Sequence, residues 1–333
     1  MKRYPRIFII FLANLLFIIV LLYHPKSDLY HIYEKSSEEI IDHYTKNISR
    51  DTGSYFYQDK GDMVRTIGYP LLLKLFMGLK RGFAYLMVFN CFLGAWMFHV
   101  VYEMIGKKAW LLFGLGAFTA YVPILYTDLL FATLFITSIW QLKKKRFWLA
   151  LILLGISSLI RPSLAWFFVL IPLVMHFYDY RPKMVFIAIP LTFLATSFSP
   201  IRNYVNHGKW THSTVLRYNI ESETYFGGAD NKPAYFIYSL KSNYLSGHYD
   251  QIGRMFNKYK RNSEDLQASL LMWLSNIICV LINAVIWLLF GIRIIKRKIN
   301  WGNIIILVYF VLPTLFGAAG ARLRLPIEFI LFL

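Results

Sequence analysis

Long apolar runs, separated by short basic clusters, constrain the fold of this chain more than any other feature. Of its 333 residues, 57% are hydrophobic, and they are gathered into many separate runs. Runs of this length form helices that are buried or that cross a membrane, and a soluble domain does not carry so many of them. We therefore predict an all-α fold, a polytopic transmembrane helical bundle with roughly nine or ten spans.

The expected spans follow from the apolar runs and from their basic flanks. They cover about residues 7–23, 82–105, 109–126, 128–142, 147–160, 163–178, 184–199, 268–292 and 301–317. The first run has no small-residue cleavage site after it, so we expect an uncleaved helix with a cytoplasmic N-terminus. The last apolar segment, 325–333, is too short to cross a bilayer at about 1.5 Å per residue.

Basic residues account for the formal net charge of +18, and their distribution argues against nucleic acid as a partner. The clearest clusters lie in short connections: Lys2-Arg3 with Arg6, Lys107-Lys108, Lys143 to Arg146, Arg181 with Lys183, and Lys296-Arg297-Lys298. This pattern is typical of cytoplasmic loops that contact anionic membrane lipids. Cys91 and Cys279 both lie in apolar runs, which excludes a disulfide framework.

Two long polar segments, about 24–81 and 200–266, are expected to be loops on the outer face of one domain that covers residues 1–333. Within the first loop, 37–48 and 70–79 are predicted to be helices that lie in the membrane interface. The histidines of the second loop (His207, His212 and His248) show no metal-ligand spacing, so we expect ordinary loop residues there.

Charged side chains recur where the expected spans reach the outer face. They are Asp51 and Arg65 in the first loop, Asp128 in a tight turn, Arg161 and Arg202 at span ends, and Arg322 and Arg324 after the last span. Arginine grips phosphate with a planar fork of donors, and a carboxylate can remove a proton from a hydroxyl. One aspartate with several arginines at a membrane edge therefore fits glycosyl transfer from a polyprenyl-phosphate sugar.

Simpler roles exist for the same residues. An arginine at a span end is often an interfacial anchor, and outer-loop arginines could pair with the acidic first loop. Asp51 could be an exposed loop carboxylate, and Asp128 could cap the helix that it precedes. Gly68-Tyr69-Pro70 could be only the turn that opens an interfacial helix.

Five short motifs nevertheless occur in a recognisable order. They are Asp51-x-x-x-Tyr55, Arg65-Thr-Ile-Gly-Tyr-Pro70, Ile160-Arg-Pro162, Pro200-x-Arg202-Asn203-Tyr204 and Arg322-x-Arg324-x-Pro326-x-Glu328. In this order and spacing the chain resembles the membrane-embedded C-type glycosyltransferase superfamily, in particular the bacterial branch related to protein mannosyltransferases and lipid A aminoarabinose transferases. The resemblance extends from about residue 7 to the end of the sequence.

The resemblance implies roles for individual residues. Asp51 would be the catalytic carboxylate, and Tyr55, Arg65, Tyr69 and Asp128 would shape the site around it. The candidates for contacts with the donor phosphate are Arg161, Arg202, Arg322 and Arg324. Two departures from the family pattern are Ile67, where relatives commonly have proline, and the absence of an adjacent acidic pair beside Asp51. The second departure leaves a divalent metal as an open alternative.

The sequence thus predicts an integral membrane glycosyltransferase whose site faces the periplasm or the cell exterior. It would move a sugar from a polyprenyl-phosphate donor to a hydroxyl of a glycan, lipid or protein. The alternatives are a flippase or transporter of lipid-linked sugars and an envelope glycan polymerase. A transporter usually shows an internal repeat or broken mid-membrane helices.

Overall fold

The computed structural model describes residues 4–23, 68–77, 82–123, 127–164, 167–210, 244–245, 248, 266–296, 299–314 and 325–333. All long elements in these ranges are α-helices: α1 (Tyr4–Tyr23), α3 (Gly68–Met77), α4 (Gly82–Ile105), α5 (Ala109–Gly114), α6 (Thr127–Lys143), α7 (Phe147–Ile160), α8 (Phe167–Phe177), α9 (Pro182–His207), α14 (Leu266–Ile295) and α15 (Trp301–Thr314). Short 3₁₀ turns cover Gly106–Lys108, Pro162–Leu164 and Glu328–Phe332. The predicted all-α class is confirmed for this part of the chain.

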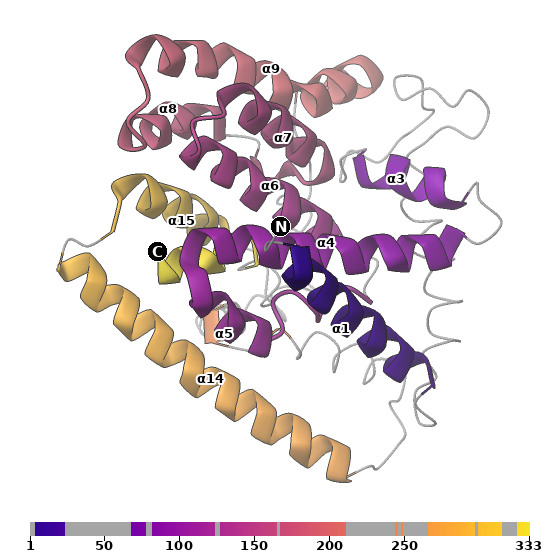
Figure 1. Ribbon diagram of the computed structural model, residues 1–333. Helices are drawn as coiled ribbons and strands as arrows, with labels where there is room; N and C mark the ends of the chain where they lie inside the picture. The colour runs from indigo at the N-terminus through magenta and orange to yellow at the C-terminus, as the bar shows by residue number, and fades with distance from the viewer. Residues whose placement is uncertain are drawn as a thin grey trace, which may run out of the picture.

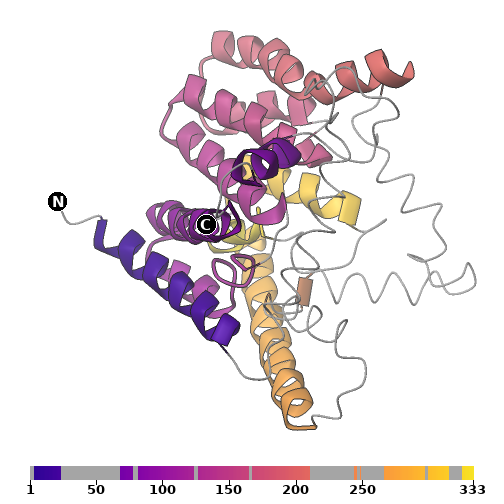
Figure 2. The same cartoon turned by 90° about the vertical axis from the view of Figure 1, so that its right-hand side faces the viewer.

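The helices pack in the order that short connections favour (Figure 1). Helix α4 contacts α1 on one side and α6 on another, α6 packs against α7, and α9 covers both α7 and α8. Helix α15 packs against α8, whereas α14 runs along the edge of the bundle (Figure 2). Short turns join antiparallel neighbours, so α7 and α9, separated by α8, run in the same direction.

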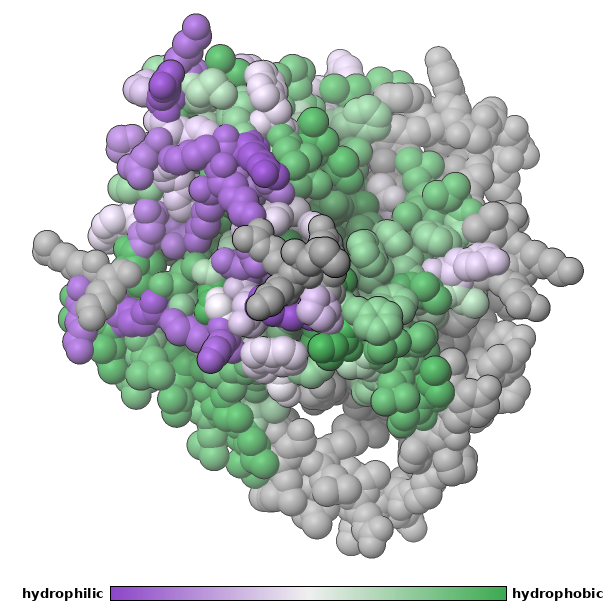
Figure 3. Space-filling view, in the orientation of Figure 1, coloured by the Kyte–Doolittle hydropathy of each residue, from purple (hydrophilic) through white to green (hydrophobic). Residues whose placement is uncertain are grey.

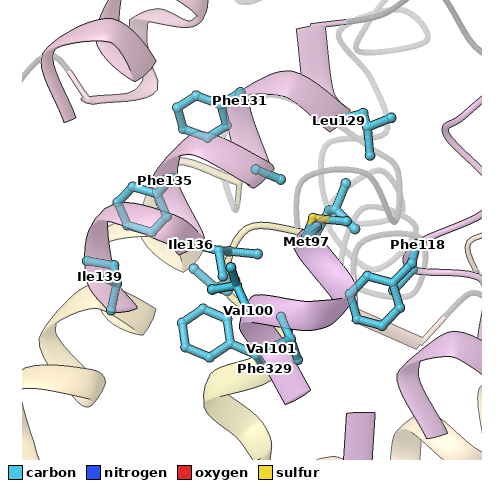
Figure 4. Close-up of a cluster of buried hydrophobic side chains, with 14 of the residues drawn as sticks. Met97, Val100, Val101, Phe118, Leu129, Phe131, Phe135, Ile136, Ile139 and Phe329 are labelled. Atoms are coloured by element: carbon cyan, nitrogen blue, oxygen red, sulfur yellow. The ribbon is translucent and has the colours of Figure 1, made fainter. Parts of the chain in front are cut away.

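The core lies between α4 and α6 (Figure 4). Met97, Val100 and Val101 of α4 face Phe131, Phe135, Ile136 and Ile139 of α6, and Phe118 and Phe329 lie beside α4 in the same cluster. The rings of Phe131 and Phe135 stack with a centroid distance of 6.0 Å. Phe310 of α15 lies 4.9 Å from Phe135, which ties α15 to the same core.

Most predicted spans correspond to observed helices. The ranges 82–105 and 147–160 are those of α4 and α7, and 128–142 lies within α6. Helix α9 continues beyond the predicted end at 199, up to Gly208, whose φ of 65° provides a left-handed cap. The predicted interfacial helix at 70–79 corresponds to α3, and the one at 37–48 lies outside the described residues.

The prediction of a spanning helix at 109–126 is wrong. Helix α5 ends at Gly114, and the chain then follows a series of turns to residue 123. Gly116 has a φ of 87°, a conformation that interrupts a helix and that glycine adopts without strain. Carbonyls freed from the helix are bonded by buried amides instead: Asn14 donates to Phe118 at 3.3 Å, and Asn90 donates to Val122 at 3.1 Å.

Three helical segments among the described residues are long and apolar enough to cross a membrane: Ala84–Gly114, Pro182–Val205 and Ile277–Ile295. Four shorter apolar helices accompany them: Pro5–Val20, Phe147–Ile160, Phe167–Phe177 and Trp301–Val311. This composition indicates association with a membrane. The terminal segment, predicted to be too short to span, forms a buried turn whose Phe332 carbonyl accepts a hydrogen bond from Lys108 at 3.0 Å.

Candidate functional site

The turns that follow α6 and α8 meet at one end of the bundle. Lys145 donates to the carbonyls of Tyr178 and Asp179, the latter at 2.9 Å, and the Tyr180 hydroxyl donates to the Leu142 carbonyl at 2.9 Å. Asn300, which precedes α15, donates to Phe177 at 2.7 Å and joins the same end. Helices α7 and α9 therefore both start here, and their other ends lie together on the far side.

Cations at this end lie over aromatic rings. The four pairs, with distances to the ring centroid, are Arg6–Tyr102 at 3.9 Å, Lys143–Tyr178 at 5.8 Å, Lys144–Trp140 at 3.6 Å and Lys145–Tyr180 at 4.9 Å. We call this region the basic end. Hydrophilic residues gather over it, whereas much of the other described surface on the face shown in Figure 3 is hydrophobic. Long cationic side chains on aromatic rings are typical of a membrane–water interface.

An ion pair joins the start of α6 to the end of α7 at the opposite end. Nη1 of Arg161 donates to Oδ1 of Asp128, whose side chain is 3% exposed. The Arg161 guanidinium also lies 5.6 Å from the centroid of the Phe131 ring. The structure thus brings together two residues predicted for the site from segments 33 positions apart.

Local sequence explains both positions. Arg161 precedes Pro162, which disfavours helical backbone at the preceding residue, and Arg161 is accordingly extended with φ −141° and ψ 140°. The Arg161 side chain therefore does not continue the i,i+4 rows of side chains along α7. Asp128 lies in the first turn of α6, where the helix dipole stabilises a carboxylate. Both features act before any tertiary contact forms.

The Gly-Tyr element packs against the same end of α7. A Cβ atom placed on Gly68 would lie 2.7 Å from the Leu159 carbonyl oxygen and 2.7 Å from Cδ1 of Ile160. Only glycine allows this approach of α3 to the residues just before Arg161. Tyr69 follows directly and is 1% exposed, so it is part of the packed structure at this end.

Arg202 lies on α9 at a comparable level. The Ser158 hydroxyl donates to the Ala195 carbonyl at 3.0 Å, which fixes the register of α7 against α9. Arg161 and Arg202 follow these two residues by three and seven positions, or roughly 5 and 10 Å at 1.5 Å per residue. Arg202 is 1% exposed, and its Nη1 lies 3.5 Å from the side-chain oxygen of Asn203.

This arrangement can bind an anion. A guanidinium has five N–H donors, and the Arg161 side chain is still 20% exposed while it is paired with Asp128. The carboxylate holds the planar fork in one orientation, so its other donors are preorganised for a phosphate oxygen. The opposite end therefore offers an oriented arginine, and the basic end offers cations that rest on rings and carbonyls.

Other predicted site residues lie outside the described residues: Asp51, Tyr55, Arg65, Arg322 and Arg324. They include the predicted catalytic carboxylate and three of the five predicted arginines. Among the residues that it does describe, no three His, Cys, Asp or Glu side chains are grouped as metal ligands.

A second buried polar cluster escaped the sequence prediction. His248 was expected to be an ordinary loop residue, which is wrong: it is 0% exposed and joins two other segments. Its Nδ1 lies 2.8 Å from the Tyr121 hydroxyl, and its Nε2 lies 2.6 Å from Oε2 of Glu328. The one signal in the sequence was an acid inside the apolar run Leu325–Leu333, because such a residue requires a partner.

Comparison with known proteins finds no relative of this chain. The chain matches no protein-family model, no curated protein and no solved structure.

Proposed function

We propose that the chain is an integral membrane glycosyltransferase that uses a polyprenyl-phosphate-linked sugar as donor. The observation that carries the proposal is the Arg161–Asp128 pair at the opposite end, next to the Gly68-Tyr69 element. In the sequence, this element follows Asp51 and Arg65. A pair that only stabilised the fold would need no exposed donors. Arg161 is held in one orientation and is partly exposed, which favours a role in binding a lipid-linked phosphate.

The arginines would bind the donor phosphate. Arg161 at the end of α7 and Arg202 near the end of α9 lie at the same end of the bundle. Arg322 and Arg324 are the further candidates from the sequence. As the bond between the anomeric carbon and the phosphate oxygen breaks, its electron pair goes to the phosphate. Fixed guanidinium donors stabilise this developing charge because they need no reorganisation during the reaction.

Asp51 would act as the general base. The acceptor hydroxyl oxygen attacks the anomeric carbon, and the hydroxyl proton passes to the Asp51 carboxylate. The products are a glycoside, a polyprenyl phosphate and a protonated Asp51, which returns its proton to solvent. Inversion at the anomeric carbon is expected for one such displacement.

The membrane topology is part of the proposal. The basic end would face the cytoplasm, following the bias of basic residues toward that side, and the Arg161–Asp128 pair would face the periplasm or the cell exterior. We propose that the four shorter apolar helices and α6, whose first turn lies at the opposite end and whose last turn lies at the basic end, span together with the three long ones. Tight packing against neighbours and local thinning of the bilayer would accommodate their length.

Substitution of the proposed base tests the function. Purified Asp51→Asn protein, incubated with a labelled polyprenyl-phosphate sugar and cell-envelope acceptors, should show a loss of transfer of at least about a hundredfold, since a general base contributes that much. Its expression and its elution from a sizing column should match those of the wild type. Asp59→Asn is the matched control, because it removes a carboxylate from the same loop and should retain transfer.

Three outcomes would contradict the proposal. Transfer by Asp51→Asn near the wild-type rate would exclude Asp51 as the base. Movement of the labelled lipid across vesicles without cleavage by the wild type would instead identify a transporter of lipid-linked sugars. Long products would identify a polymerase, which shares the same donor chemistry.

A further inference from the structure

Part of the second long polar segment, expected to lie wholly on the outer face, is held against α14 and α15. The indole nitrogen of Trp287 donates to the Tyr244 carbonyl at 3.0 Å, and Asn283 donates to the Leu245 carbonyl at 3.0 Å. The Tyr244 hydroxyl donates to the Val311 carbonyl of α15 at 3.3 Å. The rings of Tyr244 and Trp287 meet edge to face, with centroids 5.5 Å apart.

The position of these donors on α14 defines the depth of the contact. Asn283 and Trp287 lie near the middle of Ile277–Ile295, which is apolar enough to cross a membrane. Backbone carbonyls at that depth have no water to bond, so an unsatisfied one is strongly unfavourable. The two α14 side chains satisfy the Tyr244 and Leu245 carbonyls, which is what irregular backbone inside a membrane bundle requires.

His248 continues this contact into the centre of the molecule. It bridges Tyr121, from the turns after α5, and Glu328, from the terminal segment. Nε2 of His248 shares a hydrogen bond with Oε2 of Glu328, and Nδ1 shares one with the Tyr121 hydroxyl. Each ring nitrogen thus has its own buried partner, and three segments remote in sequence are joined through one imidazole.

We propose that the second long polar segment re-enters the bundle at Tyr244, Leu245 and His248, and that His248 is the anchor that holds these residues there. Tyr244 and Leu245 dock on α14, and His248 joins this docked stretch to the terminal segment through Glu328. His248 is a positioning residue, since its partners are protein side chains. In the part of the chain that the structure describes, its hydrogen-bond partners are Tyr121 and Glu328.

If the proposed function holds, the anchor also affects binding of the donor. Only this kinetic consequence rests on the proposed function. Glu328 follows Arg324 by four residues, and the intervening Leu325 and Ile327 are buried. A fixed Glu328 restrains the chain close to the two arginines proposed for the donor phosphate. Loss of the anchor should therefore raise the KM for the polyprenyl-phosphate donor several-fold more than it lowers kcat.

Cysteine accessibility tests the anchor without any assay of activity. Both native cysteines, Cys91 and Cys279, are buried, so an introduced cysteine reports its own site. Leu245→Cys in reconstituted vesicles should react slowly with a membrane-impermeant maleimide. Addition of His248→Phe, which keeps a ring but removes both hydrogen bonds, should raise its rate at least about tenfold, because loss of a buried partner favours local opening.

Two matched variants complete the experiment. Trp210→Cys, at an exposed residue just beyond α9, should react fast in both backgrounds. His248→Gln keeps a donor toward Glu328 and should give an intermediate rate at Leu245→Cys. It also replaces His248→Phe if that variant is not recovered as a monodisperse protein.

Either of two results would overturn the anchor. One is a rate at Leu245→Cys equal to that at Trp210→Cys with His248 intact. The other is an unchanged rate at Leu245→Cys in both His248 variants. The proposed function fails separately, through Asp51→Asn, so protected labelling with no glycosyl transfer would retain the anchor and reject the enzyme.

Discussion

The two ends of the bundle hold their cations in different ways. At the basic end, Lys143, Lys144 and Lys145 lie over aromatic rings, and Lys145 also donates to two carbonyls. At the opposite end, Arg161 is bound by a buried carboxylate, and Arg202 is itself buried. Rings and carbonyls anchor a cation without fixing its orientation, whereas a carboxylate at a helix start orients a guanidinium. Proximity to a membrane edge therefore does not by itself distinguish a cation that anchors the protein in the interface from a cation that binds a ligand.

Removal of one arginine should have the largest effect on stability. Arg161→Ala leaves the Asp128 carboxylate buried without its guanidinium, and we expect a loss of about 2–4 kcal/mol in the free energy of unfolding. Lys144→Ala at the basic end removes an exposed cation from the Trp140 ring and should cost less than about 1 kcal/mol. Unfolding in detergent, followed by circular dichroism, measures both.

A double variant sharpens this difference. Asp128→Asn combined with Arg161→Gln removes both charges and should recover part of the stability lost in Arg161→Ala, because no unpaired charge is then buried. Equal losses for Arg161→Ala and Lys144→Ala would mean that the two ends hold their cations alike.

Close packing at Gly68 should give the next largest effect. Gly68→Ala places a methyl group 2.7 Å from a backbone oxygen that cannot move freely, and we expect a loss of about 1–3 kcal/mol. Gly291→Ala is the matched control in α14, two residues before Arg293, where an added Cβ meets nothing within 4 Å. The control should be neutral or slightly stabilising, since alanine favours a helix over glycine. A neutral Gly68→Ala would refute the tight contact between α3 and α7.

The smallest effect is expected from a single hydroxyl at the basic end. Tyr180→Phe keeps the ring beneath Lys145 but removes the hydrogen bond to Leu142, which contributes about 1 kcal/mol. Burial raises the pKa of Tyr180 to about 12, above an unfolded value of about 10. The contribution is therefore complete below pH 10 and is lost as the pH rises toward 12. Chemical denaturation of both proteins at pH 9 and pH 11 should give a smaller difference at pH 11, and an unchanged difference would contradict the raised pKa.

Sequence reasoning succeeded where a local rule decides. The ends of α4 and α7 follow from apolar runs and basic flanks. It failed at 109–126, because Gly116 and the donors from Asn14 and Asn90 stabilise turns where the run alone favours a helix. Hydropathy counts side chains, and it contains no information about which buried amide will meet a freed carbonyl.

The candidate site divides in the same way. The sequence identified Tyr69, Asp128, Arg161 and Arg202 as candidates, but it offered no reason to pair Asp128 with Arg161. It placed His248 in an outer loop, because nothing near that residue in the sequence indicates Tyr121 or Glu328. Long-range pairs depend on the register between helices, which forms only when the helices pack.

The sequence by itself determined the helical class, most helix boundaries and the gathering of basic residues into turns, because each depends on composition and on neighbours within a few residues. Only the tertiary structure decided that Arg161 is held by Asp128, that Gly68 contacts the end of α7, and that His248 joins three segments at the centre. Those contacts depend on which helix faces meet. In an apolar environment, a buried polar group is stable only when a hydrogen-bonding or ion-pair partner is buried beside it.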